Sequence, residues 1–307
     1  MNNMFQEIIG SALGLKLRAL AHIKENAYCN IYRAEAENQP FIIKKYKGED
    51  SKLARMEARA LEFYHRVADG DEAIISSKTV KLVAEENLLC IGFVEGEPLN
   101  DFLYHARNDH EARLRALHVM EILGDFLRRL YEMTGSPGAE TDPFIFEYMA
   151  YTSARLETTP LLGRLFFSGM IEDAARLSNL LRSSDLVPSF SHGDFVFRNI
   201  HVAGNRVGLI DFANTNPRSH TLNDAYNLRL ALANMMLPYS FKRDLRAAFR
   251  RGLGDLTFPD MAHRFYYEYN RRRWLMLKIR TKSPATWTEA TRGLLGFALP
   301  YSPEMIK

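Results

Sequence analysis

The hydrophobic pattern of the chain changes near Glu95, and this change limits the folds that are open to it. From Leu15 to about Val94, runs such as "NIYRAEA" and "QPFIIKKYKG" alternate in character and are separated by the turn residues 38–40. This texture predicts an antiparallel meander. After Gly96 the apolar residues recur at helical spacing instead. We therefore predict an α+β fold, with a sheet-rich N-terminal part and a mostly helical C-terminal part.

Two segments carry clear helical periodicity. The first, "SKLARMEARALEFYHRV", opens on Ser51, a favoured N-cap residue, and crosses the predicted sheet. The second, "HEARLRALHVMEILGDFLRRLYEM", predicts a long buried helix. Its expected apolar stripe consists of Leu114, Leu117, Met120, Leu123, Leu127 and Leu130. A further helix is expected over Leu161 to Arg182.

The helical part contains one exception, the stretch "LVPSFSHGDFVFRNIHVAGNRVGLIDFANT". Its apolar clusters "NIHV" and "RVGLI" flank the turn "AGN" and predict a short hairpin. Asp194 lies in the loop before the hairpin, Asn199 opens its first strand, and Asp211 follows its second strand. The hairpin should bring their oxygen-bearing side chains together.

These oxygen atoms suit magnesium, which takes one or two protein carboxylates and leaves its other positions to water and phosphates. Asn199 and Asp211 form the natural ligand pair. Asp194 then remains to orient a hydroxyl nucleophile and to accept its proton. This division of labour is typical of phosphoryl transfer, in which the protein mainly positions the reactants and neutralises charge.

The composition removes several other classes of protein. The formal net charge is only +3, and the Lys and Arg residues are spread along the whole chain, so no nucleic-acid partner is expected. Cys29 and Cys90 lie far apart without metal-ligand spacing, which excludes a disulfide framework and a zinc site. No apolar run reaches the length of a membrane span, and no signal peptide is seen. We expect a cytoplasmic protein.

The motifs "HGDFVFRN" and "LIDFAN" resemble those of the aminoglycoside phosphotransferase and choline kinase family, the small-molecule branch of the protein-kinase-like superfamily. The resemblance implies a two-lobed kinase-like fold, with a nucleotide-binding lobe over residues 1–94 and a catalytic and acceptor-binding lobe over residues 95–307. It also implies Mg-dependent transfer of the γ-phosphoryl group of ATP or GTP to a hydroxyl of a small molecule. Sugars and glycan intermediates are among the candidate acceptors.

The same resemblance implies a strand lysine that reaches the nucleotide phosphates and a helix glutamate that holds it. The apolar-apolar-lysine pattern "IIK" selects Lys44, with Lys45 as the alternative if the register slips. The pattern "RMEARAL" selects Glu57, with Glu62 as its competitor. Phe93, Val94 and Glu95 in "CIGFVEG" take the position of the hinge whose backbone binds adenine.

Two further residues are assigned by resemblance. His192 is expected to form hydrogen bonds with the backbone and not to act in catalysis. Asp224 either anchors the catalytic loop by accepting hydrogen bonds from the backbone amides of that loop, or is a plain helix N-cap. Asp224 follows Asp211 by only thirteen residues. That spacing leaves no room for the long activation segment of protein kinases, so a small acceptor is expected.

Three features depart from the family pattern. The segment "IKENAYCNIYRAE" has no glycine where a phosphate-binding loop usually has one. Either the affinity for the nucleotide is weak, or a side chain such as Asn26 or Tyr28 covers the phosphates instead. This keeps open a catalytically inactive regulatory or scaffold protein as the alternative function. Arg198 either holds an anionic acceptor or pairs with a carboxylate on the surface of the protein. In "HRFYYEYNRRRWLMLKIRTK" we expect Tyr266, Trp274 and Leu277 to pack and the arginines to be solvated.

Overall fold

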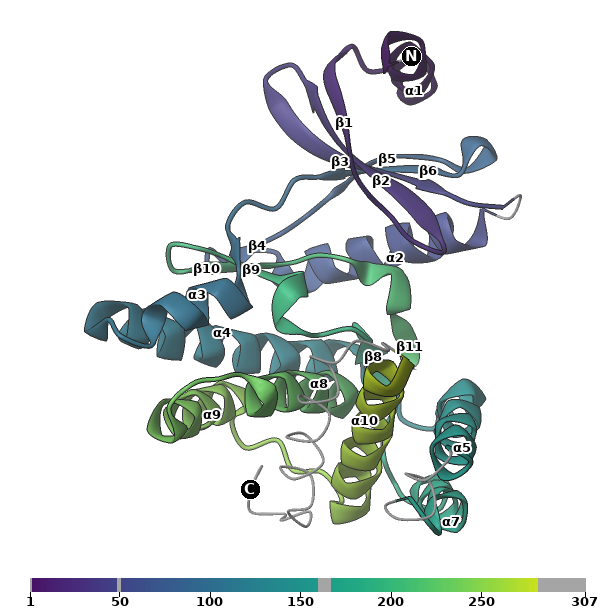
Figure 1. The fold of residues 1–307 in the computed structure, drawn as a ribbon, viewed down its shortest axis with the longest axis vertical. Coiled ribbons are helices and arrows are strands. Elements are labelled where there is room, and N and C mark those ends of the chain that lie inside the picture. The colour runs from purple at the N-terminus through teal and green to yellow at the C-terminus, as the bar shows by residue number, and fades with distance from the viewer. Residues whose placement is uncertain (1, 49–50, 160–166, 281–307) are drawn as a thin grey trace. The chain divides into compact units, whose positions relative to one another are not determined.

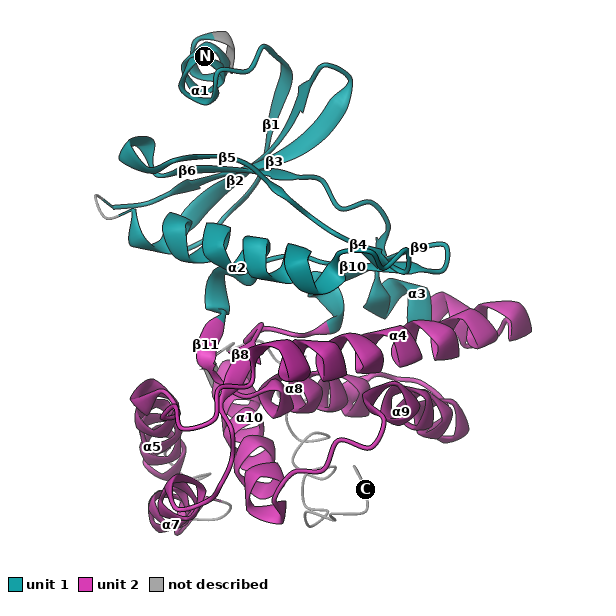
Figure 2. Cartoon of the chain, turned by 180° about the vertical axis from the view of Figure 1, so that it is seen from behind, with its two compact units in different colours: residues 1–103, 197–215 teal, residues 104–196, 216–307 magenta. Residues whose placement is uncertain are grey.

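The computed structural model describes residues 2–48, 51–159 and 167–280 (Figure 1). These residues form the predicted α+β arrangement, with strands concentrated in the N-terminal part and helices in the C-terminal part. The chain divides into two compact units (Figure 2). The sheet unit comprises Met1–Leu103 and Phe197–Thr215, and the helical unit comprises Tyr104–Val196 and Asn216–Lys307. The division near residue 95 that the family resemblance implies stays a prediction.

The sheet unit is built on a five-stranded antiparallel sheet with the order β1-β2-β3-β6-β5. Its strands are β1 (Leu17–Glu25), β2 (Cys29–Ala36), β3 (Gln39–Tyr46), β5 (Thr79–Val83) and β6 (Leu88–Gly92). The turn between β2 and β3 has two residues, Glu37 and Asn38, both with positive φ. This is the backbone that a tight hairpin requires. The expected turn over residues 38–40 was placed too late, because Gln39 and Pro40 already belong to β3. The 3-10 helix η1 (Ala84–Glu86) and left-handed Asn87 connect β5 to β6.

Two helices flank this sheet. The sequence analysis did not predict α1 (Asn2–Leu13), which buries Ile9 and Leu13 in a core shared with Ile43. The predicted crossing helix is α2 (Lys52–Ala68). Ser51 precedes it but makes no side-chain cap bond, so this part of the prediction was wrong. Its hydroxyl instead accepts a 3.0 Å hydrogen bond from Arg55 Nε, one turn along the helix.

A second sheet of the same unit contains the predicted hairpin. Its order is β4-β10-β9-β7, with β4 (Ile74–Ile75), β7 (Glu97–Pro98), β9 (Ile200–Ala203) and β10 (Arg206–Leu209). Gly96 precedes β7 with φ of 117°, and a Cβ there would stand 2.5 Å from the carbonyl oxygen of Val202. Only glycine permits both this backbone conformation and this close approach to β9.

The helical unit is mostly α-helix. After α3 (Leu99–Ala106), which runs from one unit into the other, its helices are α4 (His110–Thr134), α5 (Pro143–Glu157), α7 (Met170–Arg182), α8 (Thr221–Asn234), α9 (Tyr239–Leu253) and α10 (Asp260–Arg280). Strand β8 (Ser189–Ser191) pairs with β11 (Asn216–Ser219). The helix expected from Leu161 is seen over α7, and residues 160–166 lie outside the described part of the chain.

The expected stripe of α4 was only partly right. Leu123, Leu127 and Leu130 are buried, but Leu114 is 53% exposed. Steps of three residues advance only 300° around a helix, so Leu114 and Leu123, three such steps apart, point in opposite directions. The buried face at this end is formed by Ala112 and Ala116.

No helix within the described ranges combines the length and apolar character needed to cross a membrane. Cys29 and Cys90 are buried free thiols.

Candidate active site

A buried lysine forms the centre of the polar residues in the sheet unit. Lys44 on β3 is 4% exposed, and its Nζ lies 2.7 Å from Glu57 Oε1 and 3.0 Å from Asp211 Oδ1. Glu57, from the buried face of α2, is fully buried. Lys45, the alternative, pairs at the surface with Glu86. Of the two lysines, the structure places Lys44 beside Glu57.

The protonation of this cluster follows from its charges. Burial by itself would lower the pKa of Lys44, but the carboxylates of Glu57 and Asp211 outweigh burial, so the pKa is raised above its ordinary value. The hydroxyl of Tyr46 donates to Glu57 Oε2. Burial, together with the Glu57 charge, raises the pKa of Tyr46. Lys44 is therefore held as a cation and Tyr46 as a neutral donor.

Asp211 stands two residues after the end of β10 and has a positive φ, which is uncommon outside glycine but better tolerated by aspartate than by most residues. Its φ of 65° is left-handed, and its carboxylate is 39% exposed. The next residue, Phe212, is 1% exposed and packs on Tyr64 with ring centroids 4.9 Å apart. The Phe212 amide donates to Glu57 Oε1 at 3.1 Å. The buried Phe212 ring and this hydrogen bond thus fix the backbone conformation that directs Asp211 toward Lys44.

A cavity of about 590 Å³ lies within the sheet unit next to this cluster. The predicted residues Lys44, Phe93, Val94, Asn199 and Asp211 line it. Its other lining residues, several of them apolar, are Ile23, Lys24, Ile31, Ile42, Leu61, Ser77, Ile91, Gly92, Arg198, His201, Leu209, Ile210 and Phe212. The volume and the mixed lining fit a small-molecule site.

The hairpin brings the two predicted metal ligands to the same cavity. The backbone carbonyl of Asn199, in the 3-10 helix η2 (Phe197–Asn199), accepts the amide of Ile210 at 3.0 Å, and Asp211 follows directly. Asn199 is 5% exposed. An amide oxygen and a carboxylate that line the same cavity as the Lys44 ammonium fit magnesium, which prefers hard oxygen donors. No cluster of three or more acidic, histidine or cysteine ligands occurs among the described residues.

The predicted hinge residues differ in their surroundings. Val94 is 3% exposed, and the guanidinium of Arg33 stands 4.8 Å from the centre of the Phe93 ring. Glu95 is exposed and does not line the cavity. A lining residue that the sequence analysis missed is His201 on β9, whose pKa is lowered by burial. Its only sequence signal was its position in an apolar strand, which favours no particular role.

The glycine-free loop between β1 and β2 is closed by a side chain. Asn26 Oδ1 accepts the amides of Tyr28 and Cys29, both at 2.8 Å. This Asx turn takes the place of the conformations that glycine usually provides. Tyr28 itself is 64% exposed. The amides of Tyr28 and Cys29 therefore donate their hydrogen bonds to Asn26 within the same loop.

In the helical unit, Asp194 lies in the loop that follows β8. Asp224 from α8 fastens this loop, because it accepts the amide of His192 at 2.7 Å and the amide of Gly193 at 2.9 Å. The N-cap of α8 is His220, so Asp224 is a loop anchor and not a plain cap. The side chain of His192 accepts the Asp194 amide at 3.3 Å, in agreement with its expected structural role.

The side chain of Asp224, which anchors this loop, is completely buried. Burial raises the pKa of Asp224 to about 7, against the opposing effect of the amides of His192 and Gly193 and the hydroxyl of Ser191. Those donors satisfy the carboxylate, which explains how a charged group is tolerated at this depth.

Sequence analysis missed the role of Arg273 on α10. Its Nη1 donates to the carbonyl of Gly193, and its Nη2 lies 3.4 Å from Asp194 Oδ1. The expectation of solvated arginines was wrong for Arg272 as well, which is 1% exposed and 2.7 Å from Asp173. Leu277, expected to pack, is 54% exposed.

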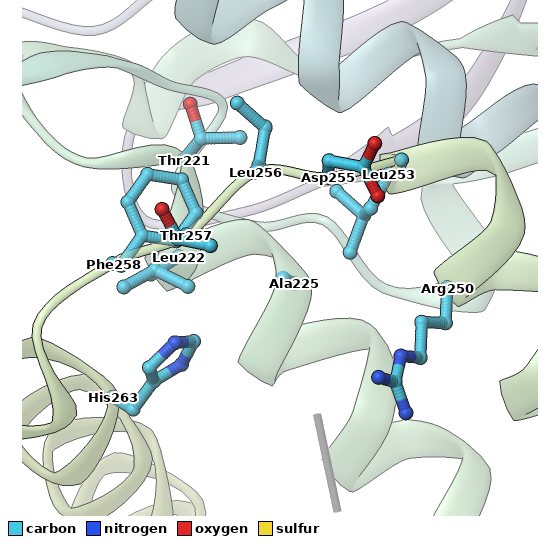
Figure 3. A pocket seen from close by; sticks show the side chains of 11 residues that line it. Thr221, Leu222, Ala225, Arg250, Leu253, Asp255, Leu256, Thr257, Phe258 and His263 are labelled. Atoms are coloured by element: carbon cyan, nitrogen blue, oxygen red, sulfur yellow. The ribbon is translucent and has the colours of Figure 1, made fainter. Parts of the chain in front are cut away.

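A second cavity, of about 310 Å³, lies between α8 and the segment that joins α9 to α10 (Figure 3). Phe258, Leu222 and His263 stand on one side of it in this view, and Arg250 stands on the opposite side. It contains none of the residues predicted for catalysis or binding.

Comparison with known proteins identifies the family. The sequence profile of the phosphotransferase enzyme family matches residues 24–219, which is more than half of the chain and includes Lys44, Glu57, Asp194, Asn199 and Asp211. The chain belongs to the phosphotransferase enzyme family. It is accordingly a phosphotransferase of the kind that acts on small molecules. No curated protein sequence matches it.

Solved structures show the same fold for this phosphotransferase. The streptomycin–ATP ternary complex of APH(2″)-IIa aligns over 100% of this chain and 98% of its own, at 15% identity and a TM-score of 0.57. A protein assigned as a fructosamine-3-kinase from Thermobifida fusca aligns over 98% and 100%, at 16% identity and a TM-score of 0.63. Amicoumacin kinase hAmiN, solved with AMP-PNP, Ca²⁺ and Ami, aligns over 99% and 96%, at 13% identity and 0.62.

Proposed function

We propose that this phosphotransferase moves the γ-phosphoryl group of ATP to a hydroxyl of a small molecule and requires magnesium. The observation that carries the proposal is the Lys44 ammonium, buried between Glu57 and Asp211 beside the 590 Å³ cavity. A fixed cation next to a carboxylate and an amide is suited to holding nucleotide phosphates. The ATP and ADP complexes of similarly folded proteins support the choice of nucleotide.

Each residue then has a defined part. Lys44, held by Glu57, binds the phosphates, and the backbone of residues 93–95 binds the adenine edge. Asn199 and Asp211 would hold magnesium, which neutralises phosphate charge when bound. Asp194 orients the acceptor and takes its hydroxyl proton as the new oxygen–phosphorus bond forms and the bond to the β-phosphate oxygen breaks. ADP and the phosphorylated acceptor are the products.

The anchoring of the loop supports the role of Asp194. A proton acceptor must be positioned before its pKa matters. The hydrogen bonds that Asp224 accepts and Arg273 donates fix the backbone of His192 and Gly193, directly before Asp194. Asp194 belongs to the helical unit, whereas the phosphate-binding and metal-binding residues belong to the sheet unit. The proposal requires that they act together during turnover.

Calorimetric titration with ATP tests the proposal, with and without magnesium, on the native chain and on Asp211→Ala. Binding that needs both magnesium and Asp211 is the expected result, and Glu62→Ala, at an exposed side chain of α2, should bind as the native chain does. ADP release with an acceptor panel should fall by about 100-fold or more in Asp194→Asn. Absence of ATP binding in every condition would favour an inactive scaffold protein, for which the closed Asn26 loop is the supporting feature.

A further inference from the structure

Four aromatic side chains of the helical unit form a continuous cluster, called the aromatic strip below: Phe144, Tyr148 and Tyr151 at the surface and Tyr269, 7% exposed, beneath them. The first three lie at positions i, i+4 and i+7 of α5 and therefore share one face. Their ring centroids are separated by 5.8 Å and 6.2 Å, and Tyr269 of α10 stands 5.8 Å from Tyr148. Phe144 is 56% exposed and Tyr151 is 46% exposed. Large aromatic side chains exposed together on a helix are typical of a binding surface.

The aromatic strip is joined to the catalytic loop through α10. Helices α5 and α10 lie side by side in both views (Figures 1 and 2). Arg273 follows Tyr269 by one helical turn, and it contacts Gly193 and Asp194. A molecule lying on the strip is thus one helical turn of α10 away from the arginine that holds the proposed base.

The start of α5 is tied to the same loop. Asp142 caps α5 by accepting the Phe144 amide at 3.0 Å, and its other oxygen accepts Asn216 Nδ2 at 2.9 Å. Asn216 in turn pairs with Ser191, three residues before Asp194. The helix that carries the strip is therefore fixed relative to the loop at its first turn.

The charges near the strip disfavour a strongly cationic molecule. Arg273 already places a guanidinium on Asp194. The nearby carboxylates are engaged, because Asp142 caps α5 and both Asp173 and Glu268 contact Arg272. Among the described residues, the exposed carboxylates nearest to the strip in sequence are Glu147 on α5 and Glu140, four residues before Phe144. Two such groups cannot balance the several ammonium ions of a strongly cationic molecule.

We propose that the acceptor is an uncharged glycoside whose rings stack on the aromatic strip while one hydroxyl reaches Asp194. This rests on the proposed phosphotransfer. A sugar ring has an apolar C–H face that packs on an aromatic ring and a rim of hydroxyls that remain hydrated, which suits half-exposed side chains. From Phe144 to Tyr151 α5 rises about 10 Å, enough for an acceptor of two linked rings. Aromatic faces also attract cations, but Arg273 opposes an ammonium at the reactive end.

Saturation-transfer NMR measures binding without any need for turnover. The probes are the neutral disaccharides maltose, cellobiose and lactose as methyl glycosides, with gentamicin and choline as cationic probes. At least one neutral glycoside should bind, and Tyr151→Ala and Phe144→Ala should each weaken it by about tenfold. Tyr239→Ala, at an exposed ring on α9, is the matched control and should have no effect. Glu147→Gln should also leave neutral binding unchanged.

Phosphate transfer from ATP to the bound glycoside gives the second measurement. Tyr151→Ala should raise KM about tenfold with kcat retained, as expected for a residue that binds the acceptor at a distance from the reacting atoms. Preference for gentamicin or choline that Glu147→Gln abolishes would overturn the assignment, as would no binding by any neutral glycoside. Glycoside binding to the strip without phosphate transfer would support the strip as a glycoside-binding site and would count against the proposed phosphotransfer alone.

Discussion

Replacing Glu57 with leucine removes the acceptor of three buried donors and should weaken the sheet unit strongly. These donors are Lys44 Nζ, the Phe212 amide and the Tyr46 hydroxyl. Breaking a buried ion pair from one side costs about 3–5 kcal/mol, and Asp211, 3.0 Å from Lys44, keeps part of the pairing. The other two donors add about 1–3 kcal/mol each if they find no partner. Leucine packing offsets some of this, so we expect a loss of about 4 kcal/mol in the free energy of unfolding.

Urea unfolding followed by circular dichroism measures this loss. Hydrogen exchange of peptides from β3 and α2 shows whether it falls on the sheet unit, which contains neither tryptophan of the chain. Glu62→Leu is the matched control, since Glu62 lies on the same helix and is exposed. That change should stay within about 0.5 kcal/mol. If Glu57→Leu lowered stability by less than about 1 kcal/mol, or no more than the control, the claim that this carboxylate satisfies buried donors would fail.

Three further changes test other parts of the structure. The pKa of Asp224 is raised to about 7 in the folded chain, so its contribution to stability is present below pH 4 and is lost as pH rises toward 7; Asp224→Asn should flatten this part of the pH–stability curve. Gly96→Ala should cost about 3 kcal/mol, since it adds a clash with a β9 carbonyl to a strained φ, whereas Gly70→Ala, with positive φ but open space, should cost about 1 kcal/mol in the same urea assay. Arg272→Met should lower stability by about 2 kcal/mol and Arg271→Met by less than about 0.5 kcal/mol, and equal losses in thermal unfolding would contradict the difference in burial.

The parts of the fold that sequence predicted are those set by local patterns. Alternation along β3 placed Ile42 and Lys44 on one face, and both line the cavity. The hairpin followed from two apolar runs and a turn, which is why Asn199 and Asp211 were paired in advance. Glu57 was chosen over Glu62 because "RMEARAL" resembles the helix pattern of the family, and the structure buries Glu57 and leaves Glu62 exposed.

The parts that sequence did not predict depend on neighbours far along the chain. Three consecutive arginines point in three directions around α10, and nothing local tells that Arg272 meets Asp173 or that Arg273 meets the catalytic loop. Helix α1 was missed because its apolar residues are covered only by a sheet that the later sequence supplies. The functional roles of the site residues remain predictions that the variants above address.

The left-handed backbone of Asp211 narrows the set of residues that can occupy this position. Glycine, asparagine and aspartate adopt a φ near 65° most readily, and of these three aspartate carries a carboxylate. Asp211→Gly would free the backbone but would also remove the carboxylate that lies 3.0 Å from the buried Lys44 ammonium, a loss that exceeds the gain. Glutamate would keep the charge but does not share this tolerance of positive φ. A variant library at position 211 therefore offers no second acidic choice, and directed evolution of this enzyme gains by leaving the position unchanged.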